Sequence, residues 1–329
     1  MNAIRQRLLA KMADLPEFMG NRKMGVAVSG GCDSVALLFL LVHLCRMKKI
    51  EICIFHVDHK LRPHSAKDAM WVAQLADELG IKFYSCEANS EDFAAIRKSR
   101  GVEAWAREFR YRSFAALCDE AGVEILATGH TADDQLETVL MKLFSGTSIK
   151  GFAGIQAFSQ MEVAGKKIGL WRPMLKISRE ELEKYLKSEK KSWLEDETNA
   201  HTDFLRNKIR HELIPKISEI FGRPGEKLTC LLEDLRGVSR HIENEAKEYL
   251  RKNLVQNRLK LEEQPEILMA EIVHQWLLKL NLARNVSRSL VKRIVDLWKT
   301  NVTYRKVDHR NYSFVKRRGE IVFLTGKDT

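Results

Sequence analysis

The sequence lacks the features that mark membrane-spanning or exported proteins. Its longest apolar run, residues 35–45, has eleven residues and is interrupted by His43, whereas a membrane helix needs about 20. The first fifteen residues are charged throughout and contain no apolar core of signal-peptide length. We therefore expect a cytoplasmic protein that does not span a membrane.

Cysteine is also scarce, and no two cysteines form a C-x-x-C pair. This distribution favours neither a disulfide framework nor a zinc or iron–sulfur site. We expect small, buried, apolar residues in a reducing compartment. The six are Cys32, Cys45, Cys53, Cys86, Cys118 and Cys230.

The composition is that of an ordinary globular protein, with 45% apolar and 30% charged residues, and it excludes a disordered, collagenous or coiled-coil chain. The 329 residues are enough for two domains, or three small ones. The net charge of +11 is uneven, because residues 1–215 carry +3 and residues 216–329 carry +8. A polyanion such as nucleic acid is a reasonable partner, although many basic surfaces are merely solvated.

In the first half, short apolar runs alternate with helical patterns. This alternation predicts an α/β fold with a doubly wound parallel sheet, in which ligands lie beyond the carboxyl ends of the strands. The expected strands cover residues 24–29, 50–57, 81–86 and 123–127, and the expected helices cover residues 33–44, 65–79, 90–98, 102–121 and 133–144.

The pattern loosens after Gly146 into a glycine-rich loop that reaches about residue 169. Ser178 and Glu181 then form a capping box that opens a helix to about residue 189. We place a domain boundary at Pro215, which gives domains 1–215 and 216–329. The second is expected to be smaller, mainly helical and basic, with helices over residues 227–253, 266–280 and 287–298 and a two-stranded hairpin over residues 304–324.

The first chemical motif is Ser29-Gly30-Gly31-Cys32-Asp33-Ser34, between an expected strand and helix. Two glycines let the backbone approach a ligand, and the helix start offers free N–H groups to an anion such as pyrophosphate. Asp33 would repel a bare phosphate but suits Mg²⁺ bridging to it. An ordinary glycine turn is the alternative. Neither a Walker A loop nor a G-x-G-x-x-G fingerprint is present.

Two further motifs follow along the same predicted sheet edge. Residues 56–62 (HVDHKLR) offer His and Asp side chains that suit a metal, or that simply close a strand. In residues 102–112, Glu103, Arg107 and Arg110 lie about one helical turn apart. That face offers guanidinium groups to phosphates, unless it is a solvated helix surface.

The last two motifs combine acids and bases. His130, Asp134 and Glu137 share one face of a predicted helix, where the acids serve the helix dipole or hold an ammonium group. Arg206, Lys208 and Arg210 form a basic cluster that contacts nucleic acid or phosphate, or is only solvated.

The motif at residues 29–34, called the glycine loop below, resembles the PP-loop of N-type ATP pyrophosphatases. In order, S-G-G-x-D-S, H-V-D-H-x-L-R, A-T-G-H-x-x-D-D-x-x-E-T and R-N-x-I-R-x-x-x-I-P make residues 23–215 closely similar to the tRNA(Ile)-lysidine synthase family. The C-terminal part is similar to the short form of that family. The resemblance implies a PP-loop ATPase fold, also described as adenine nucleotide alpha hydrolase-like.

The resemblance also implies a reaction. Such enzymes use ATP to adenylate O2 of the cytidine at the first anticodon position of a tRNA(Ile) with a CAU anticodon. The ε-amine of free L-lysine then attacks C2 and expels AMP, giving lysidine. ATP, Mg²⁺, L-lysine and tRNA(Ile) are thus the implied cofactors and partners, and homodimer formation is left open.

Residue roles follow from the same resemblance. The loop residues Ser29, Gly30, Gly31, Cys32, Asp33 and Ser34 would bind ATP, with Phe55 and His56 near the adenine and Asp33 on Mg²⁺. Arg110 is the first candidate to stabilise the α-phosphate, followed by Arg107, His130 and Arg206. Asp134 and Glu137 would bind the lysine, and one of them would be the base. Lys208 and Arg210, with Arg107 and Arg206, are the candidates for contact with tRNA or phosphate.

Two rival functions are a tRNA thiolase of the same superfamily and an RNA-binding protein without turnover. A thiolase needs a cysteine pair or a cluster, and the sequence has no C-x-x-C. A pure RNA binder gains nothing from the acids at 33, 134 and 137. The expected catalytic set is Asp33, Arg110, His130, Asp134 and Glu137.

Overall fold

The computed structural model describes residues 3–16, 23–61, 65–89, 92, 101–145, 149–163, 165–195, 205–222, 224–282, 286–302 and 304–325. Its chain forms two compact units, Met1–Leu232 and Glu233–Thr329. The division falls within helix α11 (Pro224–Asn253), whereas the sequence analysis placed a boundary at residue 215. Arg62 and, apart from Asp92, the helix expected over residues 90–98 lie outside the described residues.

Unit 1 is built on a six-stranded sheet with the strand order β3-β2-β1-β4-β6-β5. All neighbouring strands are parallel except β5, which is antiparallel to β6. The expected parallel sheet is therefore confirmed. The strands are β1 (Met24–Ala27), β2 (Ile52–Asp58), β3 (Lys82–Glu87), β4 (Ile125–Ala127), β5 (Phe158–Val163) and β6 (Lys166–Trp171).

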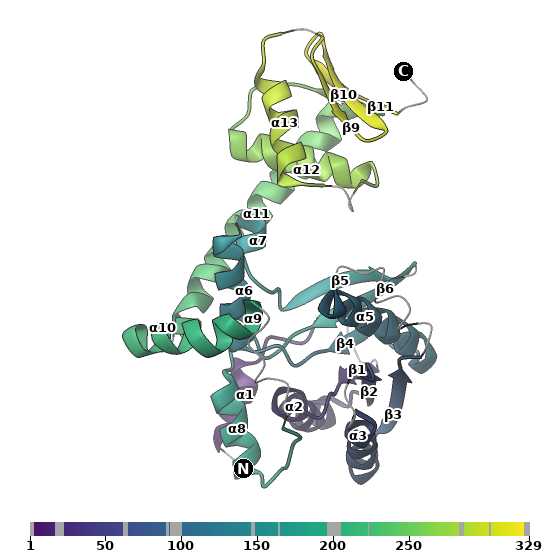
Figure 1. Cartoon of the computed structure of the whole chain (residues 1–329), viewed down its shortest axis with the longest axis vertical. Coiled ribbons are helices and arrows are strands. Elements are labelled where there is room, and N and C mark those ends of the chain that lie inside the picture. Colours follow the sequence, from purple (N-terminus) through teal and green to yellow (C-terminus); the bar gives the residue numbers. More distant parts are fainter. Residues whose placement is uncertain are drawn as a thin grey trace. The chain divides into compact units, whose positions relative to one another are not determined.

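Helices cover both faces of this sheet (Figure 1). Alternate residues of β2 point to opposite faces, as the period of a strand requires. Ile54 joins the core under α1, α2, α3 and α8, and Phe55 joins the core under α5. These helices span α1 (Ala3–Lys11), α2 (Cys32–Lys48), α3 (Ser65–Leu79), α5 (Val102–Ala121) and α8 (Arg179–Ser188).

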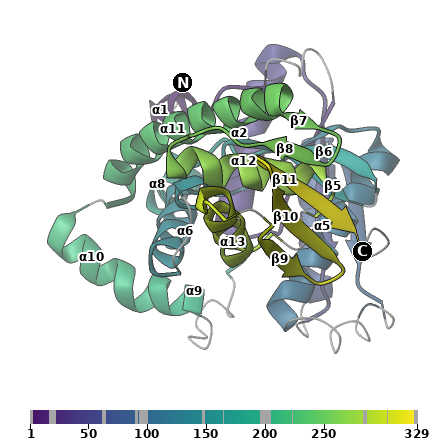
Figure 2. The same cartoon turned by 90° about the horizontal axis from the view of Figure 1, so that it is seen from above.

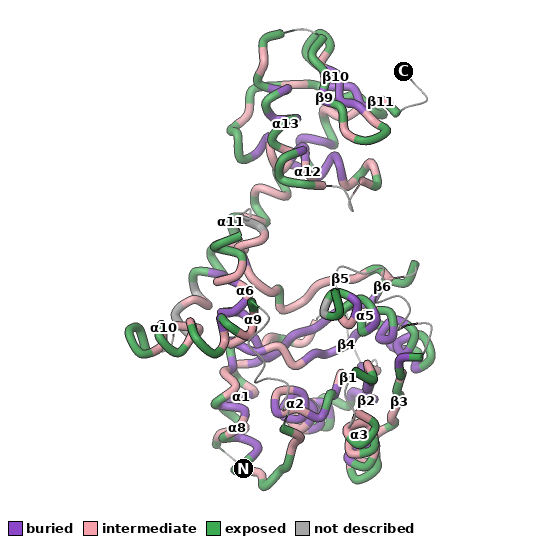
Figure 3. Tube along the Cα trace, viewed as in Figure 1, coloured by how far each residue is buried: buried purple, intermediate pink, exposed green. Residues whose placement is uncertain are grey.

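Helix α2 is the most deeply buried of these elements (Figure 3). Leu37, Leu38, Leu40 and Leu41 are all fully buried, so the helix is apolar around most of its circumference. Replacing one such leucine by alanine typically costs about 2–5 kcal/mol. The core therefore fixes the position of α2, and with it the glycine loop that leads into its first turn.

The β5–β6 hairpin was not expected from the sequence, which indicated a loop there. The apolar part of β6 is only four residues long, 168–171, follows two lysines and contains Gly169. That glycine is required, because a Cβ atom at this position would lie 2.9 Å from the Phe158 ring. A small residue that sheet packing demands therefore looked like loop composition.

Residues 205–221 form one helical stretch with a π-helical middle: α9 (Leu205–Lys208), a π-helix (Ile209–Leu213) and α10 (Ile214–Phe221). Pro215 stands in the first turn of α10. Proline has no N–H to give to the carbonyl four residues earlier, and a local change to a wider helical turn accommodates that loss. Arg206 and Arg210 both lie on this stretch, on either side of the α-to-π change.

Unit 2 combines the C-terminal part of α11 with α12 (Glu266–Lys279), α13 (Arg288–Lys299) and a five-stranded antiparallel sheet of order β7-β8-β11-β10-β9. The three expected helices are present. The single hairpin expected over residues 304–324 is instead three strands lying side by side (Figure 2). The strands are β7 (Leu254–Val255), β8 (Arg258–Lys260), β9 (Lys306–His309), β10 (Tyr312–Arg317) and β11 (Glu320–Thr325).

Unit 2 has its own core, in which Trp276 and Phe314 are fully buried and meet edge to face with ring centroids 5.5 Å apart. Within the described residues of the whole chain, none of the helices has the length and hydropathy needed to cross a membrane.

Candidate active site

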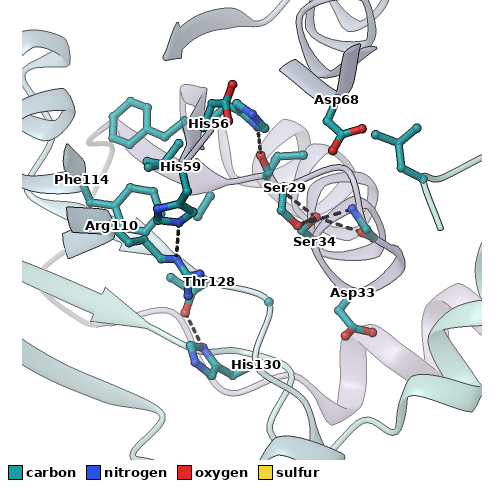
Figure 4. Close-up of a pocket in the computed structure, with 18 of the residues that line it drawn as sticks. Ser29, Asp33, Ser34, His56, His59, Asp68, Arg110, Phe114, Thr128 and His130 are labelled. Atoms are coloured by element: carbon teal, nitrogen blue, oxygen red, sulfur yellow. Dashed lines mark hydrogen bonds between the residues drawn. The ribbon is translucent and has the colours of Figure 1, made fainter. Parts of the chain in front are cut away.

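A cavity of about 720 Å³ lies in unit 1 at the carboxyl ends of β1, β2 and β4 (Figure 4). It is lined by the loops that follow these strands and by residues of α5, α8, α9 and the π-helix. Four of the five sequence motifs line it directly through several residues, and the basic cluster does so through Arg206 and Arg210. This is the position at which doubly wound sheets bind ligands.

The glycine loop is shaped by hydrogen bonds that converge on Ser34. Its Oγ accepts from Ser29 N at 3.1 Å, donates to Gly31 O at 2.9 Å and lies 3.1 Å from Ser29 Oγ. Gly30 has a φ of +94°, and a Cβ atom there would lie 2.7 Å from Leu194 Cδ1. Leu194 N also donates to Gly30 O at 2.9 Å. The loop conformation is thus fixed both by hydrogen bonds within the loop and by its contacts with Leu194.

The start of α2 has no side-chain cap. Gly31 occupies the N-cap position, whereas Thr131 at α6 (Ala132–Phe144) and Ser178 at α8 both form capping boxes. The first-turn N–H groups of an uncapped helix are available to an anion and lie at the positive end of its dipole. Gly129 packs close by, since its Cβ would lie 3.2 Å from the backbone of Asp33.

Asp33 projects from this helix start into the cavity (Figure 4). Its Oδ1 is buried and has no hydrogen-bond partner in the described part of the chain. Arg179 Nη1 lies 4.0 Å from Oδ2. Burial raises the pKa of Asp33 to about 6, an effect that Arg179 opposes and that Asp134 and Asp133 reinforce. A buried carboxylate with a raised pKa is stabilised in its ionised form when a ligand brings a cation next to it.

The end of β2 contributes His56. Its Nδ1 lies 2.9 Å from Val28 O, and since a carbonyl only accepts, Nδ1 carries a proton, which in the neutral imidazole leaves Nε2 as an acceptor. Phe55 is also among the lining residues, but its ring is fully buried in the core under α5, with an edge-to-face contact to Tyr84. The Phe55 side chain is therefore committed to packing.

Helix α5 supplies two guanidinium groups. Arg110 Nε donates to His59 Nε2 at 3.4 Å, and Arg107 stacks 4.9 Å from the Tyr111 ring centroid. Burial lowers the pKa of Arg110, yet a guanidinium remains cationic at neutral pH. Arg112 instead pairs with Asp92 outside the cavity.

His130 follows β4, and its Nδ1 lies 2.9 Å from Thr128 Oγ1 (Figure 4). Burial lowers the pKa of His130 to about 4, and the positive charges of Arg172, Arg206 and Arg107 add to that effect against Asp134. The imidazole is therefore neutral at pH 7.

Asp134 and Glu137, two of the three acids of α6, are paired with the two arginines of the basic cluster. Arg206 Nε donates to Glu137 Oε2 at 2.6 Å and Arg206 Nη2 donates to Asp134 Oδ1 at 2.7 Å. Arg210 Nε donates to the other Glu137 oxygen at 2.5 Å. Asp134 Oδ2 also accepts from Thr131 N at 2.8 Å, within the capping box.

This pairing separates residues that the sequence grouped together. Glu137 has no exposed surface and does not line the cavity, whereas Asp134 does. Arg206 and Arg210 also line the cavity, while Lys208, between them, is exposed and does not. The spacing of the motifs could not show that the acids of one motif hold the bases of another.

Sequence reasoning missed Arg179, a cavity residue at the first position of α8. The capping box at Ser178 and Glu181 was recognised, but the strands before it were not. The start of α8 could therefore not be placed on the ligand side of the sheet. It also missed that Asp133 Oδ2 accepts from Arg179 N at 2.8 Å, which ties α8 to α6.

The lining carries six basic and four acidic side chains, which favours an anionic ligand with several charges. The basic residues are Lys60, Arg107, Arg110, Arg179, Arg206 and Arg210, and the acidic ones are Asp33, Asp58, Asp68 and Asp134.

Comparison with known proteins gives a consistent result. Residues 1–217 match a family model described as a PP-loop domain. The chain is 33% identical to a tRNA(Ile)-lysidine synthase of Nostoc sp., over 84% of this chain and 80% of that protein. It is 29% identical to one of Chlamydia trachomatis over 92% of each.

Among solved structures, a U34-tRNA thiolase of Methanococcus maripaludis with its [4Fe-4S] cluster superposes with a TM-score of 0.58. That match has 14% sequence identity and covers 70% of this chain and 77% of the thiolase. At this identity the likeness concerns the fold alone.

Proposed function

Since the chain belongs to the tRNA(Ile)-lysidine synthase family, we propose that it joins L-lysine to C2 of the cytidine at the first anticodon position of tRNA(Ile) with a CAU anticodon. It is a ligase that forms a carbon–nitrogen bond at the expense of ATP. Cytidine O2 attacks the α-phosphorus and pyrophosphate leaves. The lysine ε-amine then attacks C2, and O2 departs with AMP.

The glycine loop holds the tail of ATP. The uncapped N–H groups of α2, together with the hydroxyl of Ser29, surround the pyrophosphate that will leave, while Ser34 shapes the loop through its bond to Gly31 O. His56 Nε2 accepts a hydrogen bond from the adenine side of the nucleotide, since Nδ1 is held by Val28. Phe55 supports this region from the core rather than by stacking.

Asp33 fits a magnesium ion, because its buried Oδ1 has no partner in the described chain. No group of three or more His, Cys, Asp or Glu residues there is placed to hold a metal. An ion at Asp33 would therefore take most of its ligands from phosphates and water, as Mg²⁺ commonly does. Bound there, Mg²⁺ would neutralise charge on the leaving pyrophosphate.

Arg110 and Arg107 stabilise the charge that develops on the α-phosphate. Both are oriented before the reaction, Arg110 by a long hydrogen bond to His59 and Arg107 by stacking on the Tyr111 ring. Preorganised cations of this kind typically contribute 10²-fold or more to a rate. His130, neutral at pH 7, positions the phosphate by hydrogen bonding and adds no charge of its own.

Asp134 faces the lysine. Of the three acids on α6 it alone lines the cavity, and its Oδ1 is bonded only to arginines. The amine attacks only when neutral, so a carboxylate here both attracts the ammonium and takes its proton. Glu137 acts through Arg206 and Arg210, whose fixed positions orient them toward the cavity.

The tRNA is bound by basic residues of unit 2, in the cytoplasm. Between residues 299 and 319 the sequence has seven basic residues and one acidic residue. Arg305, Lys306 and Arg318 are exposed and offer salt-sensitive contacts to the phosphate backbone. The target cytidine must leave the anticodon stack to enter the cavity, which a single-stranded loop readily allows.

The observation that supports this function best is the buried Asp33 Oδ1, which has no hydrogen-bond partner among the described residues and lies beside an uncapped helix start, in a cavity rich in arginine. An RNA-binding protein without turnover would not gain from burying such a carboxylate. The thiolase alternative has no support among the described residues, where burial raises the pKa of the Cys32 thiol to about 12.

The decisive experiment incubates the protein with ATP, Mg²⁺, labelled lysine and a tRNA(Ile) transcript with a CAU anticodon. We expect label in this transcript and none in a matched transcript with U at the first anticodon position. Equal labelling of both would refute the cytidine assignment. Arg110→Ala and Asp134→Ala should each lower incorporation by about 10²-fold or more, and near-normal rates would show that these residues have other roles.

A further inference from the structure

Arg179 is a cavity residue to which the proposed reaction has given no task. Its backbone position is fixed from two sides. Ser178 and Glu181 form the capping box at the start of α8, and Asp133 Oδ2 accepts from Arg179 N at 2.8 Å. The helix itself packs on the buried helix α2 through the core they share. The backbone that carries the Arg179 side chain is therefore held rigidly near the glycine loop.

The guanidinium of Arg179 is oriented but not fully engaged. Nη1 lies 4.0 Å from Asp33 Oδ2, which is beyond hydrogen-bond length. Nε lies 3.4 Å from Glu183 Oε1, an i,i+4 contact that is itself long. The side chain is 40% exposed. It can therefore reorient toward a better acceptor without breaking a strong bond.

A second pair on the same helix shows what a purely surface role looks like. Lys184 and Glu180 pair with each other across one turn, with about 60% of each side chain exposed, and neither lines the cavity. Arg179, in contrast, points to the Asp33 carboxylate of the glycine loop. Its planar fork of donors matches the paired oxygens of a phosphate.

We propose that Arg179 binds the β- and γ-phosphates of ATP, and the pyrophosphate formed from them, and that it pairs with Asp33 when no nucleotide is bound. This assignment rests on the proposed function, because it requires that the loop at residues 29–34 binds ATP through its β- and γ-phosphates. In the nucleotide-free protein Arg179 compensates the buried Asp33 charge only in part. A bound pyrophosphate group takes over the guanidinium and leaves Asp33 to face a cation.

The position of Arg179 predicts which ligands it affects. It contacts groups that ATP and pyrophosphate have and AMP lacks. Removing the guanidinium should therefore weaken ATP and inorganic pyrophosphate binding by about 10- to 100-fold, the range for a hydrogen-bonded charged pair. Binding of AMP should change less than about 2-fold.

The experiment measures binding of ATP, inorganic pyrophosphate and AMP to the full chain by calorimetry, with magnesium chloride present and without lysine or tRNA. The variants are Arg179→Ala, Arg179→Lys, which keeps the charge but not the fork, and Lys184→Ala as the matched control on α8. We expect Arg179→Lys to lie between Arg179→Ala and the wild type, and Lys184→Ala to match the wild type.

Two results would overturn the proposal. If Arg179→Ala weakens AMP binding by the same factor as it weakens ATP binding, relative to the wild type, the residue supports the fold of the site rather than the phosphates. If all three ligands bind Arg179→Ala as they bind the wild type, the residue does not contact nucleotide. Lysine incorporation by the wild type separates this question from the reaction, because an inactive wild type that binds ATP refutes the proposed function alone.

Discussion

Arg206 Nε lies 2.6 Å from Glu137 Oε2, a carboxylate with no exposed surface, and Arg210 Nε donates to the second oxygen of the same group. One buried charge thus holds two cations that reach the active-site cavity. Glu137 is therefore both a structural residue of α6 and the anchor of the basic cluster that follows it by about seventy residues in the sequence.

Replacing Glu137 by alanine should destabilise the protein by about 2–4 kcal/mol. Removing one partner of a buried pair leaves the opposite charges uncompensated, and partial exposure of the two arginines moderates the loss. Urea unfolding measures the change. Glu180→Ala, which removes an exposed partner of Lys184, should cost about 0.5 kcal/mol or less.

The contacts of Glu137 with Arg206 and Arg210 also predict that Asp134 and Glu137 have different roles in turnover. Asp134→Asn should raise the KM for lysine by about 10-fold or more, since Asp134 lines the cavity. Glu137→Gln should mainly lower kcat, because it disturbs Arg206 and Arg210 without meeting lysine. Steady-state kinetics at varied lysine concentration separate the two effects, and a larger KM change in Glu137→Gln would reverse the assignment.

The two adjacent glycines of the glycine loop should differ sharply in how well they tolerate replacement by alanine. Gly30→Ala introduces a side chain at a φ of +94° and 2.7 Å from Leu194 Cδ1, so it should cost about 1–3 kcal/mol. Gly31 has a φ of −70°, and an added Cβ would meet only Ser29 Oγ at 3.7 Å. The free energy of unfolding of Gly31→Ala should therefore lie within about 0.5 kcal/mol of that of the wild type. Similar losses in both variants would contradict this account of the loop.

The sequence was sufficient for the parts of the fold that depend on local pattern. Helix α5 has the bounds that its apolar spacing predicted, and the glycine loop stands between β1 and α2 as its residues required. It was not sufficient where distant segments decide the structure. Gly169 belongs to a strand because the Phe158 ring occupies the space of its side chain, and no local pattern records that contact.

The site shows the same division. The motifs identified most of the residues that line the cavity, because those at residues 29–34, 56–62 and 127–140 adjoin the ends of β1, β2 and β4, which meet at one sheet edge. They could not assign partners. The ionic partners of Glu137 are Arg206 and Arg210, and the neighbour of Asp33 is Arg179. These pairings depend on how α8, α9 and the π-helix pack.

The pKa of Asp33 predicts a pH dependence of nucleotide binding. Because burial raises this pKa to about 6, Asp33 is mostly protonated at pH 5 and mostly ionised at pH 7. Binding of ATP with Mg²⁺ should therefore weaken as the pH falls through 6, by up to about 10-fold for each unit below it. Calorimetric titrations between pH 5 and 8 measure this, and in Asp33→Asn the step near pH 6 should disappear.

The same carboxylate predicts a conflict between stability and function. The folded-state pKa of Asp33 lies above its unfolded value of 3.8, so the folded protein binds the proton more tightly and the ionised group opposes folding. Its destabilising effect is absent below about pH 4, grows as the pH rises to 6 and is complete above it. Asp33→Asn removes the charge and keeps the shape.

At pH 7.5 we therefore expect Asp33→Asn to be more stable than the wild type by about 1–2 kcal/mol, while losing nearly all lysine incorporation. Thermal unfolding at pH 7.5 and pH 4.5 gives the comparison, and the gain should shrink at the lower pH, where Asp33 in the wild type is already neutral. If the variant is less stable than the wild type at pH 7.5, then Arg179 compensates the Asp33 charge fully and the carboxylate is not strained in the folded protein.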